Sequence, residues 1–326
     1  MAARPMAKAT KKDRKTEETL TKYTPSQNPL DFYISEEKAS YDKQKSFSVY
    51  YDDSEHSVRL LQGDCIEILN RARENSVDMI FADPPYFLSN GGFTCHAGRM
   101  VSVNKGKWDK SNGTSKDHEF TIDWLTACRR VLKDDGTIWV SGTMHNIYSI
   151  GFALQKLDYK LLNDISWFKP NAAPNLSCRY FTHSHETLIW AAKSEKSKHK
   201  FDYQLMKQLA GGKQMRSLWK DISVEDDPQD IWSISTPKNT EKIFGKHPTQ
   251  KPLAVLERII LAATNPDDLI LDPFTGSSTT GVAAVRHNRR FVGIDNEAAY
   301  LDLSVKRLKG EFVQTNNRLQ LIKGLT

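Results

Sequence analysis

From about residue 56 onward, short apolar segments rich in β-forming residues alternate with segments that have the periodicity of a helix. Strands that alternate with helices are typical of α/β proteins with a largely parallel sheet. No helical pattern separates segments 161–168 and 185–192, so we expect these two strands to pair antiparallel at one edge of the sheet. The other predicted strands are 57–61, 77–82, 137–141, 269–272 and 290–294, and the predicted helices are 65–73, 122–132, 145–157, 252–263 and 279–286.

The length and composition exclude several classes of protein. The chain has 326 residues, which is enough for one large domain or two small ones. No apolar run approaches the roughly 18 residues of a membrane helix, and the polar N-terminus lacks the apolar centre of a secretory signal. The four cysteines lie at least 30 residues apart, a spacing that fits neither a zinc site nor a redox pair. We therefore expect a cytoplasmic protein with reduced thiols, no membrane contact and no metal.

The N-terminal segment is distinct from the rest of the chain. Residues 1–30 carry seven Lys or Arg and three acids, show no periodic pattern and contain few apolar residues. Such a composition predicts a disordered basic tail. Because the tail supplies most of the formal net charge of +6, overall basicity is only weak support for a nucleic-acid partner.

Two segments interrupt the alternation of strands and helices. Residues 87–118 are rich in Gly, Ser, Asn and Lys, and residues 194–246 are charged and irregular. Long connections without regular structure are uncommon in compact domains unless they serve a function. We interpret both inserts as candidates for substrate contact, and mobile surface loops are the alternative.

The first motif with chemical content is Asp83-Pro84-Pro85-Tyr86, which follows an apolar strand. In an open parallel sheet, ligands bind beyond the carboxyl ends of the strands. The prolines hold the turn rigid and remove backbone donors, so the Asp83 carboxylate and the Pro84 carbonyl remain as acceptors. Together with the flat ring of Tyr86, these acceptors suit a planar aromatic ring that bears an amino group. A proline turn that only ends a buried strand is the alternative.

The second motif runs from Asp272 to Gly281, where a buried strand ends in an acid and a loop of small residues opens a helix. Small residues allow close approach of a ligand, and a helix N-terminus favours negative charge. Asp295 ends the next strand, where it can hold the hydroxyls of a ribose. Because Asp272-Pro273 replaces the first glycine of a dinucleotide fingerprint, the motif favours a ligand with a ribose and no pyrophosphate. A simple strand–helix turn is the alternative.

Two weaker motifs accompany these. His247-Pro248-Thr249-Gln250-Lys251-Pro252 supplies hydroxyl, amide and cationic donors immediately before a helix. Asp64 and Cys65 follow a strand and a turn, where Asp64 could equally be an ordinary helix cap.

The motifs DPPY (83–86), DPFTGSS (272–278) and HPTQKP (247–252) together resemble those of DNA amino-methyltransferases that use S-adenosylmethionine. Their order resembles that of the β group, a circular permutation of the common methyltransferase fold. The similarity covers about 56–310 and includes segments 144–157, 162–175 and 179–191. The chain is similar to cell-cycle and restriction-system adenine methyltransferases, although its loop after Tyr86 is longer than in the former and their extra C-terminal segment is missing.

The resemblance implies a seven-stranded Rossmann-like sheet, mostly parallel with one antiparallel strand and with helices on both faces. It also implies that residues 31–326 form a single catalytic methyltransferase domain. Insert 87–118 would lie over the active site, and insert 194–246 would recognise the target. By the match, the catalytic residues are Asp83, Pro84 and Tyr86, and the cofactor-binding residues are Asp64, Cys65, Asp83, Thr249, Lys251, Asp272, Phe274, Gly276, Ser277 and Asp295.

The implied reaction transfers a methyl group from S-adenosylmethionine to the N6 amino group of adenine. Hydrogen bonds from N6 to Asp83 and to the Pro84 carbonyl would direct its lone pair toward the methyl group, with direct transfer and no metal. A stacked duplex hides N6, so the base must be flipped out, or presented in a single strand, and stack on Tyr86. His183 and His185 are expected to be structural.

A basic segment predicts the DNA contacts. Residues 193–220 carry eight Lys or Arg and two acids, interleaved with aromatic residues. Phosphate contacts position a protein on DNA and a few side chains read the bases, whereas an ordinary solvated surface is the alternative. The predicted DNA-binding residues are Arg99, Lys105, Lys107, Trp108, Lys207, Lys213 and Arg216.

Three other functions remain as alternatives. Cytosine-N4 methylation uses a similar amine, although many N4 enzymes have Ser in place of the first acid, so Asp83 favours adenine. Release-factor glutamine methyltransferases carry NPPY in the unpermuted order, which argues against them. A nucleotide-binding protein without catalysis is the third. The resemblance also leaves open a homodimer and a cognate restriction endonuclease as partners, in the nucleoid of a bacterium or a phage-infected cell.

Overall fold

The fold was analysed in a computed structural model, which describes residues 47–89, 93–96, 99–102, 106–170, 172, 174–219, 237, 239–245 and 247–323. The predicted basic tail 1–30 and Lys105 lie outside these residues. Among the described residues, no helix combines the length and the apolar character needed to span a bilayer.

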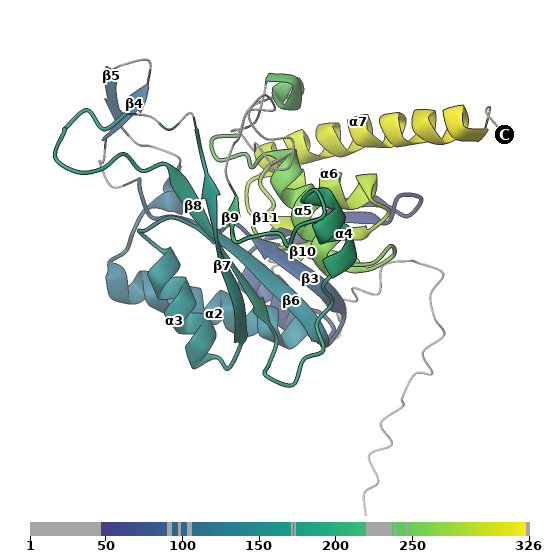
Figure 1. The fold of residues 1–326 in the computed structure, drawn as a ribbon, viewed down its shortest axis with the longest axis horizontal. Coiled ribbons are helices and arrows are strands. Elements are labelled where there is room, and N and C mark those ends of the chain that lie inside the picture. Colours follow the sequence, from purple (N-terminus) through teal and green to yellow (C-terminus); the bar gives the residue numbers. More distant parts are fainter. Residues whose placement is uncertain are drawn as a thin grey trace, which may run out of the picture.

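One mixed sheet organises the molecule (Figure 1). Its strands lie in the order β1-β2-β11-β10-β3-β6-β8-β7-β9. All seven predicted strands are present, and among these seven only β8 runs antiparallel to its neighbours, as predicted. Two edge strands, β1 and β9, extend the predicted sheet to nine strands. The bounds are β1 Phe47–Asp53, β2 Val58–Gly63, β3 Val77–Ala82, β6 Leu132–Gly142, β7 Lys160–Phe168, β8 His185–Ala192, β9 Leu218–Trp219, β10 Leu269–Asp272 and β11 Arg290–Asp295.

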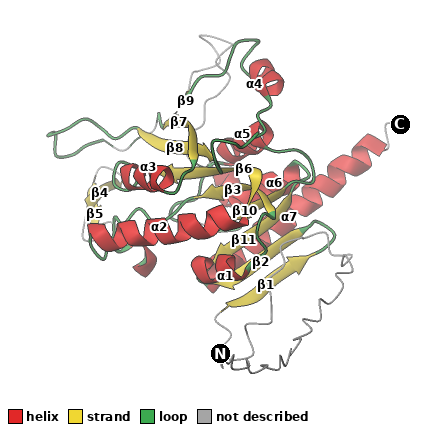
Figure 2. Ribbon diagram, turned by 90° about the horizontal axis from the view of Figure 1, so that it is seen from below, coloured by secondary structure: helices red, strands yellow, loops and turns green. Residues whose placement is uncertain are grey.

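Helices cover both faces of the sheet (Figures 1 and 2). Helices α1, α2 and α3 pack on one face of the sheet through one hydrophobic core. Helices α5, α6 and α7 pack on the opposite face through a second hydrophobic core. The strands between the two cores are nearly continuous apolar runs because both of their faces are buried. The bounds are α1 Cys65–Arg71, α2 Thr114–Val131, α3 Ile147–Lys156, α4 Tyr203–Leu209, α5 Leu253–Ala263, α6 Thr279–Arg286 and α7 Ala298–Lys323.

The two inserts contain more regular structure than the sequence predicts. The first holds a hairpin of β4 (Phe93–His96) and β5 (Arg99–Ser102), a 3₁₀ turn η2 (Lys107–Asp109) and the first turn of α2. The second holds α4, β9 and a 3₁₀ turn η3 (Asn239–Lys242). The expectation of irregular inserts is therefore wrong for these parts: β4 and β5 form a separate two-stranded sheet, β9 joins the edge of the main sheet, and α4 packs against α5.

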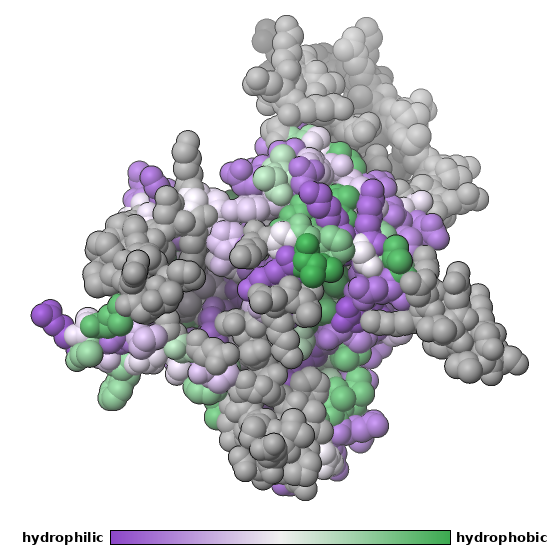
Figure 3. Space-filling model, turned by 90° about the horizontal axis from the view of Figure 1, so that it is seen from above, coloured by the Kyte–Doolittle hydropathy of each residue, from purple (hydrophilic) through white to green (hydrophobic). Residues whose placement is uncertain are grey.

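Among the residues coloured by hydropathy on the face seen from above, hydrophilic side chains predominate and hydrophobic ones form patches between them (Figure 3). This pattern is that of an ordinary solvent-facing surface, on which single apolar residues are common. The apolar residues are concentrated instead in the two cores beside the sheet.

Candidate active site

The carboxyl ends of four parallel strands, β2, β11, β10 and β3, meet at one edge of the sheet. Residues that follow these strands surround a cavity of about 260 Å³. Its wall also includes Trp108, Phe120 and Tyr300, which the sequence did not assign to it. All ten residues predicted to bind the cofactor line this cavity: Asp64, Cys65, Asp83, Thr249, Lys251, Asp272, Phe274, Gly276, Ser277 and Asp295.

The loop after β10 is shaped by Asp272 and Gly276. The Asp272 carboxylate accepts hydrogen bonds from the Phe274 backbone N–H (3.0 Å) and the Thr280 hydroxyl (2.6 Å), which ties the loop to the start of α6. Gly276 adopts a φ of 50°, and a Cβ there would lie 3.0 Å from the His247 ring. Glycine thus permits both the turn and the close approach of the loop to His247.

Asp295 links this loop to the end of β11. Its carboxylate accepts from the backbone N–H of Gly276 (2.9 Å) and of Glu297 (2.8 Å). Burial raises the pKa of Asp295 to about 6, and burial raises the pKa of Asp272 to about 7. Both carboxyl groups therefore change their ionisation close to neutral pH.

Helix α7 fixes the same loop from behind. The Ser304 hydroxyl donates to the Gly276 carbonyl (2.8 Å), and the Arg307 guanidinium donates to the carbonyl and hydroxyl of Ser277 (2.5 and 2.9 Å). Ser304 and Arg307 are both buried. These contacts hold the small-residue loop in a defined shape although it has few side-chain atoms of its own to pack.

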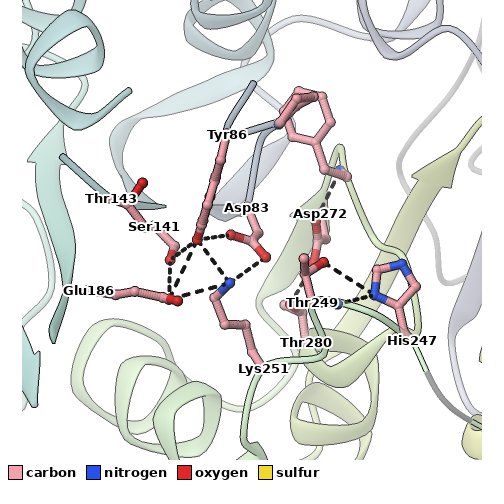
Figure 4. Close-up of polar contacts among 12 residues, drawn as sticks. Asp83, Tyr86, Ser141, Thr143, Glu186, His247, Thr249, Lys251, Asp272 and Thr280 are labelled. Atoms are coloured by element: carbon pink, nitrogen blue, oxygen red, sulfur yellow. Dashed lines mark hydrogen bonds and ion pairs between the residues drawn. The ribbon is translucent and has the colours of Figure 1, made fainter. Parts of the chain in front are cut away.

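A second group of side chains forms a buried polar cluster beside the cavity (Figure 4). The Tyr86 hydroxyl donates to one Asp83 oxygen (2.7 Å), and the Lys251 ammonium donates to the other (2.5 Å) and to the Tyr86 hydroxyl (3.0 Å). Ser141, at the end of β6, lies 3.1 Å from the Tyr86 hydroxyl. Glu186, near the start of β8, lies 3.5 Å from the Lys251 ammonium.

The charges in this cluster balance. Burial would lower the pKa of Lys251, but Asp83 and Glu186 outweigh burial, and the pKa is raised well above its ordinary value. Burial would raise the pKa of Glu186, but the ammonium groups of Lys251 and Lys169 outweigh it, and the pKa is lowered. Burial, together with the neighbouring carboxylates, raises the pKa of Tyr86. At neutral pH the cluster therefore contains charged Lys251 and Glu186 and a neutral tyrosine hydroxyl.

Asp109, in η2, fixes the chain that follows β3. Its fully buried carboxylate accepts from the backbone N–H of Tyr86 and Phe87 (2.9 Å each) and of Leu88 (3.2 Å), and from the Ser89 hydroxyl (2.8 Å). Four hydrogen bonds to one carboxylate hold the DPPY turn against the first insert, and Phe87 there adopts a φ of 58°.

Four of the predicted site residues do not lie where the sequence led us to expect them. Pro84 and Tyr86 are buried beside the cavity but do not line it, so stacking of a base on Tyr86 stays a prediction. Trp108, predicted to contact DNA, lines the cavity. The Lys251 ammonium points into the Asp83 cluster (Figure 4).

The remaining predicted DNA contacts lie in two places. Lys207, Lys213 and Arg216 are exposed in or after α4. Arg99 lies in β5 and Lys107 in η2. Within the described part of the chain, no group of three or more His, Cys, Asp or Glu side chains is arranged to hold a metal ion.

Glu186 and Asp109 both contact Tyr86 of the DPPY turn, but the sequence did not single them out. Glu186 lies in segment 179–191, whose resemblance to family members was the only signal available for it. Asp109 lies in an insert rich in polar residues, where nothing in the local pattern distinguishes it from a solvated acid.

Comparisons with known proteins agree with this geometry. The model of a DNA methylase family matches residues 77–306. The Type II methyltransferase M2.LlaDCHI of Lactococcus lactis subsp. cremoris is 52% identical over 259 residues, which cover 79% of this chain and 91% of that protein. The Type II methyltransferase M2.DpnII of Streptococcus pneumoniae is 51% identical over 263 residues, which cover 80% of this chain and 92% of that protein.

Two solved structures have the same fold. The protein chain in the M1.HpyAVI–SAM complex is 27% identical to this chain, and the two superpose with a TM-score of 0.55. The match covers 77% of this chain and 98% of the M1.HpyAVI chain. The PvuII cytosine-N4-specific DNA methyltransferase is 22% identical, with a TM-score of 0.58 over 80% of this chain and 92% of its own, and supports the fold alone. With the family match over residues 77–306 and two relatives above 50% identity, the chain belongs to the DNA methylase family.

Proposed function

We propose that this DNA methyltransferase transfers a methyl group from S-adenosylmethionine to the N6 amino group of adenine in DNA. The observation that carries the proposal is that Asp83, the first residue of the DPPY turn, lines the same cavity as Asp272 and Asp295. An acceptor for the target amino group therefore lies beside the residues that would hold the cofactor.

The cavity fits S-adenosylmethionine. Asp295 would accept hydrogen bonds from the ribose hydroxyls, and the absence of a side chain at Gly276 leaves room against the loop. Phe274, whose ring packs edge-on against Trp124 at 5.4 Å, offers an apolar wall for the adenine ring of the cofactor. When bound, the cofactor supplies an electrophilic methyl group on a positively charged sulfur.

The protein's own residues would orient the target amine. The Asp83 carboxylate and the Pro84 carbonyl accept its two N–H groups, which directs the nitrogen lone pair away from the ring and toward the cofactor. The anionic Asp83 also favours the positive charge that develops on that nitrogen. Pro85, Trp108 and Phe120 line the same cavity and give it an apolar wall.

Cytosine N4 is the second candidate target, because it too is an exocyclic amine. The PvuII enzyme is specific for cytosine N4, and its likeness to this chain supports the fold alone. Asp83 as the first residue of the turn favours adenine. Digestion of methylated DNA to nucleosides distinguishes the two: N6-methyladenine supports the proposal, and N4-methylcytosine without it contradicts the proposal.

The face that would contact DNA includes two described features. Lys207, Lys213 and Arg216 are exposed and suited to phosphate contacts. The connection between β7 and β8 projects beyond the sheet at the same end as the β4–β5 hairpin (Figures 1 and 2). Its segment 174–184 contains no acid and exposes Tyr180 (61%) and Phe181 (96%), which makes it a candidate for contact with bases.

The biological setting follows from the relatives, which are named Type II methyltransferases. We infer that this chain modifies DNA within a restriction–modification system in the bacterial cytoplasm, associated with the nucleoid. A homodimer and a cognate endonuclease remain part of this proposal, and gel filtration of the purified chain tests the first of them.

Replacement of Asp83 tests the catalytic assignment. Asp83→Ala should reduce methyl transfer to DNA by at least about 100-fold, because it removes the acceptor for the target amine, while the Kd for S-adenosylmethionine stays within a few-fold. Asp164→Ala, which alters an exposed acid on β7, is the matched control and should leave both quantities unchanged. Undiminished transfer by the Asp83 variant contradicts the assignment, and a wild-type protein that binds the cofactor without labelling DNA favours the non-catalytic alternative.

A further inference from the structure

We propose that Glu186 is a positioning residue that draws the Lys251 ammonium away from Asp83 when the target amino group arrives. The inference rests on the proposed function, because it concerns the same acceptor.

Asp83 has no free oxygen in the polar cluster. The Tyr86 hydroxyl donates to Oδ1 at 2.7 Å, and the Lys251 ammonium donates to Oδ2 at 2.5 Å. Lys251 thus occupies the position in which a target amine would donate its hydrogen bond. An ammonium group against Asp83 also neutralises the carboxylate, which weakens its attraction for positive charge developing on the target nitrogen. Transfer therefore requires that Lys251 have another partner.

Glu186 is placed to be that partner. Its side chain is buried (8% exposed), and its Oε2 lies 3.5 Å from the Lys251 ammonium. The Lys251 ammonium lies between Asp83 and Glu186 (Figure 4). Glu186 does not line the cavity, whereas Asp83 and Lys251 do. Movement of the ammonium toward Glu186 therefore brings it closer to a residue that does not line the cavity and leaves Asp83 Oδ2 open to the target.

Neighbouring groups hold Glu186 in this position. Its other oxygen, Oε1, pairs with the ammonium of Lys169, the residue that follows β7. Ser141 and the Tyr86 hydroxyl both lie 3.5 Å from Oε2. The ammonium groups of Lys169 and Lys251 thus face the carboxylates of Glu186 and Asp83. When Lys251 exchanges Asp83 for Glu186, the Asp83 carboxylate loses its counter-ion without any proton transfer.

The variant Glu186→Gln tests this role. The amide keeps the size of the side chain but cannot attract the ammonium as a carboxylate does, so Lys251 stays on Asp83. We expect kcat to fall about 10-fold or more, with the Kd for S-adenosylmethionine within twofold of wild type. Glu311→Gln is the matched control, since Glu311 is also a buried carboxylate and is paired with an arginine, Arg286, in another part of the protein. It should leave kcat unchanged.

A binding measurement gives a readout that is independent of turnover. DNA with adenine at the target position is compared with DNA whose target base is purine, which lacks the amino group. Wild type should bind the adenine DNA more tightly, and Glu186→Gln should lose most of that difference. An unchanged difference together with unchanged kcat would overturn the proposal.

The double variant Glu186→Gln/Lys251→Met, assayed at saturating cofactor, tests whether Glu186 acts through Lys251. If Glu186 acts through Lys251, the Glu186→Gln change should cost no further kcat once Lys251→Met is present. If the two single variants each lower kcat and their fold-losses multiply in the double variant, Glu186 acts independently of Lys251, which contradicts the inference. Nucleoside analysis of wild-type product identifies the methylated base in the same assay, so a failure of the adenine assignment is recognised separately from a failure of the role of Glu186.

Discussion

Asp295 joins the loop after β10, which lines the cavity, to the end of β11. The ionisation of its carboxyl group changes close to neutral pH. Its pKa is raised to about 6, with burial as the largest cause. The ionised form accepts hydrogen bonds from ribose hydroxyls with both oxygens, whereas the protonated form has given up part of that capacity. The cofactor therefore binds the ionised form preferentially, and by linkage its affinity rises with pH.

We predict that the affinity for S-adenosylmethionine increases severalfold as the pH rises from about 5 to 7, through the pKa of Asp295. Calorimetric titration over this range measures the effect. Asp295→Asn should lower the affinity about 10-fold or more at pH 7.5 and should flatten the rise with pH. A variant whose affinity still rises as in wild type would exclude Asp295 as the group responsible.

Three of the residues that the sequence assigned to the site share a position in the fold. Asp83, Asp272 and Asp295 each follow or end an apolar strand, and the carboxyl ends of parallel strands lie at one edge. Their convergence on one cavity could be inferred from the pattern. Glu186 could not, because it comes from the antiparallel strand β8 and its role depends on which lysine the fold brings to it.

At the scale of elements, the Asp109 side chain ties the 3₁₀ turn η2 to the DPPY turn. Asp109→Ala would leave the buried Tyr86 N–H, the half-buried Phe87 and Leu88 N–H groups and the Ser89 hydroxyl without their acceptor. We predict a loss of about 3 kcal/mol in the free energy of unfolding, measured by urea denaturation, and a larger proportional loss of methyl transfer than of cofactor affinity. Asp117→Ala, at a more exposed acid of α2, is the comparison; equal stability of both variants would contradict the prediction.

The β7–β8 connection supports a prediction about base flipping. Phe181→Ala should raise KM for duplex DNA about 5- to 50-fold by removing a stacking surface. A substrate with a mismatch at the target adenine should be affected less, because its base is already easier to extrude. Tyr148→Ala, at an exposed aromatic residue of α3, serves as the control. Equal losses on both substrates would show that Phe181 has no part in flipping.

Secondary structure was predictable where burial on both faces dictates the sequence. The predicted bounds 77–82, 185–192 and 269–272 agree with β3, β8 and β10. Strand β1 was missed because it lies at the edge of the sheet and half of its residues are polar or exposed. Helix α4 was missed because its seven residues are stabilised by contacts with the rest of the fold and by the Asp202 cap.

At the scale of the whole molecule, the distribution of charge predicts how DNA binding responds to salt. Lys207, Lys213 and Arg216 are exposed, and each phosphate contact contributes about −0.9 to the slope of log K against log salt concentration. Replacing all three with Ala should reduce the steepness of that slope by up to about 3, measured by fluorescence anisotropy with a labelled duplex. An unchanged slope would place the phosphate contacts elsewhere.

The strand order has a consequence for how the enzyme is made. Strand β3, which presents Asp83, lies between β6 and β10, but β10 begins only at Leu269. At about 5–20 residues per second, a ribosome needs on the order of 10 to 40 s to travel from one strand to the other. During that interval the nascent chain has its DPPY turn but neither of the strands that carry Asp272 and Asp295, so a newly started copy cannot modify DNA until translation has passed Asp295.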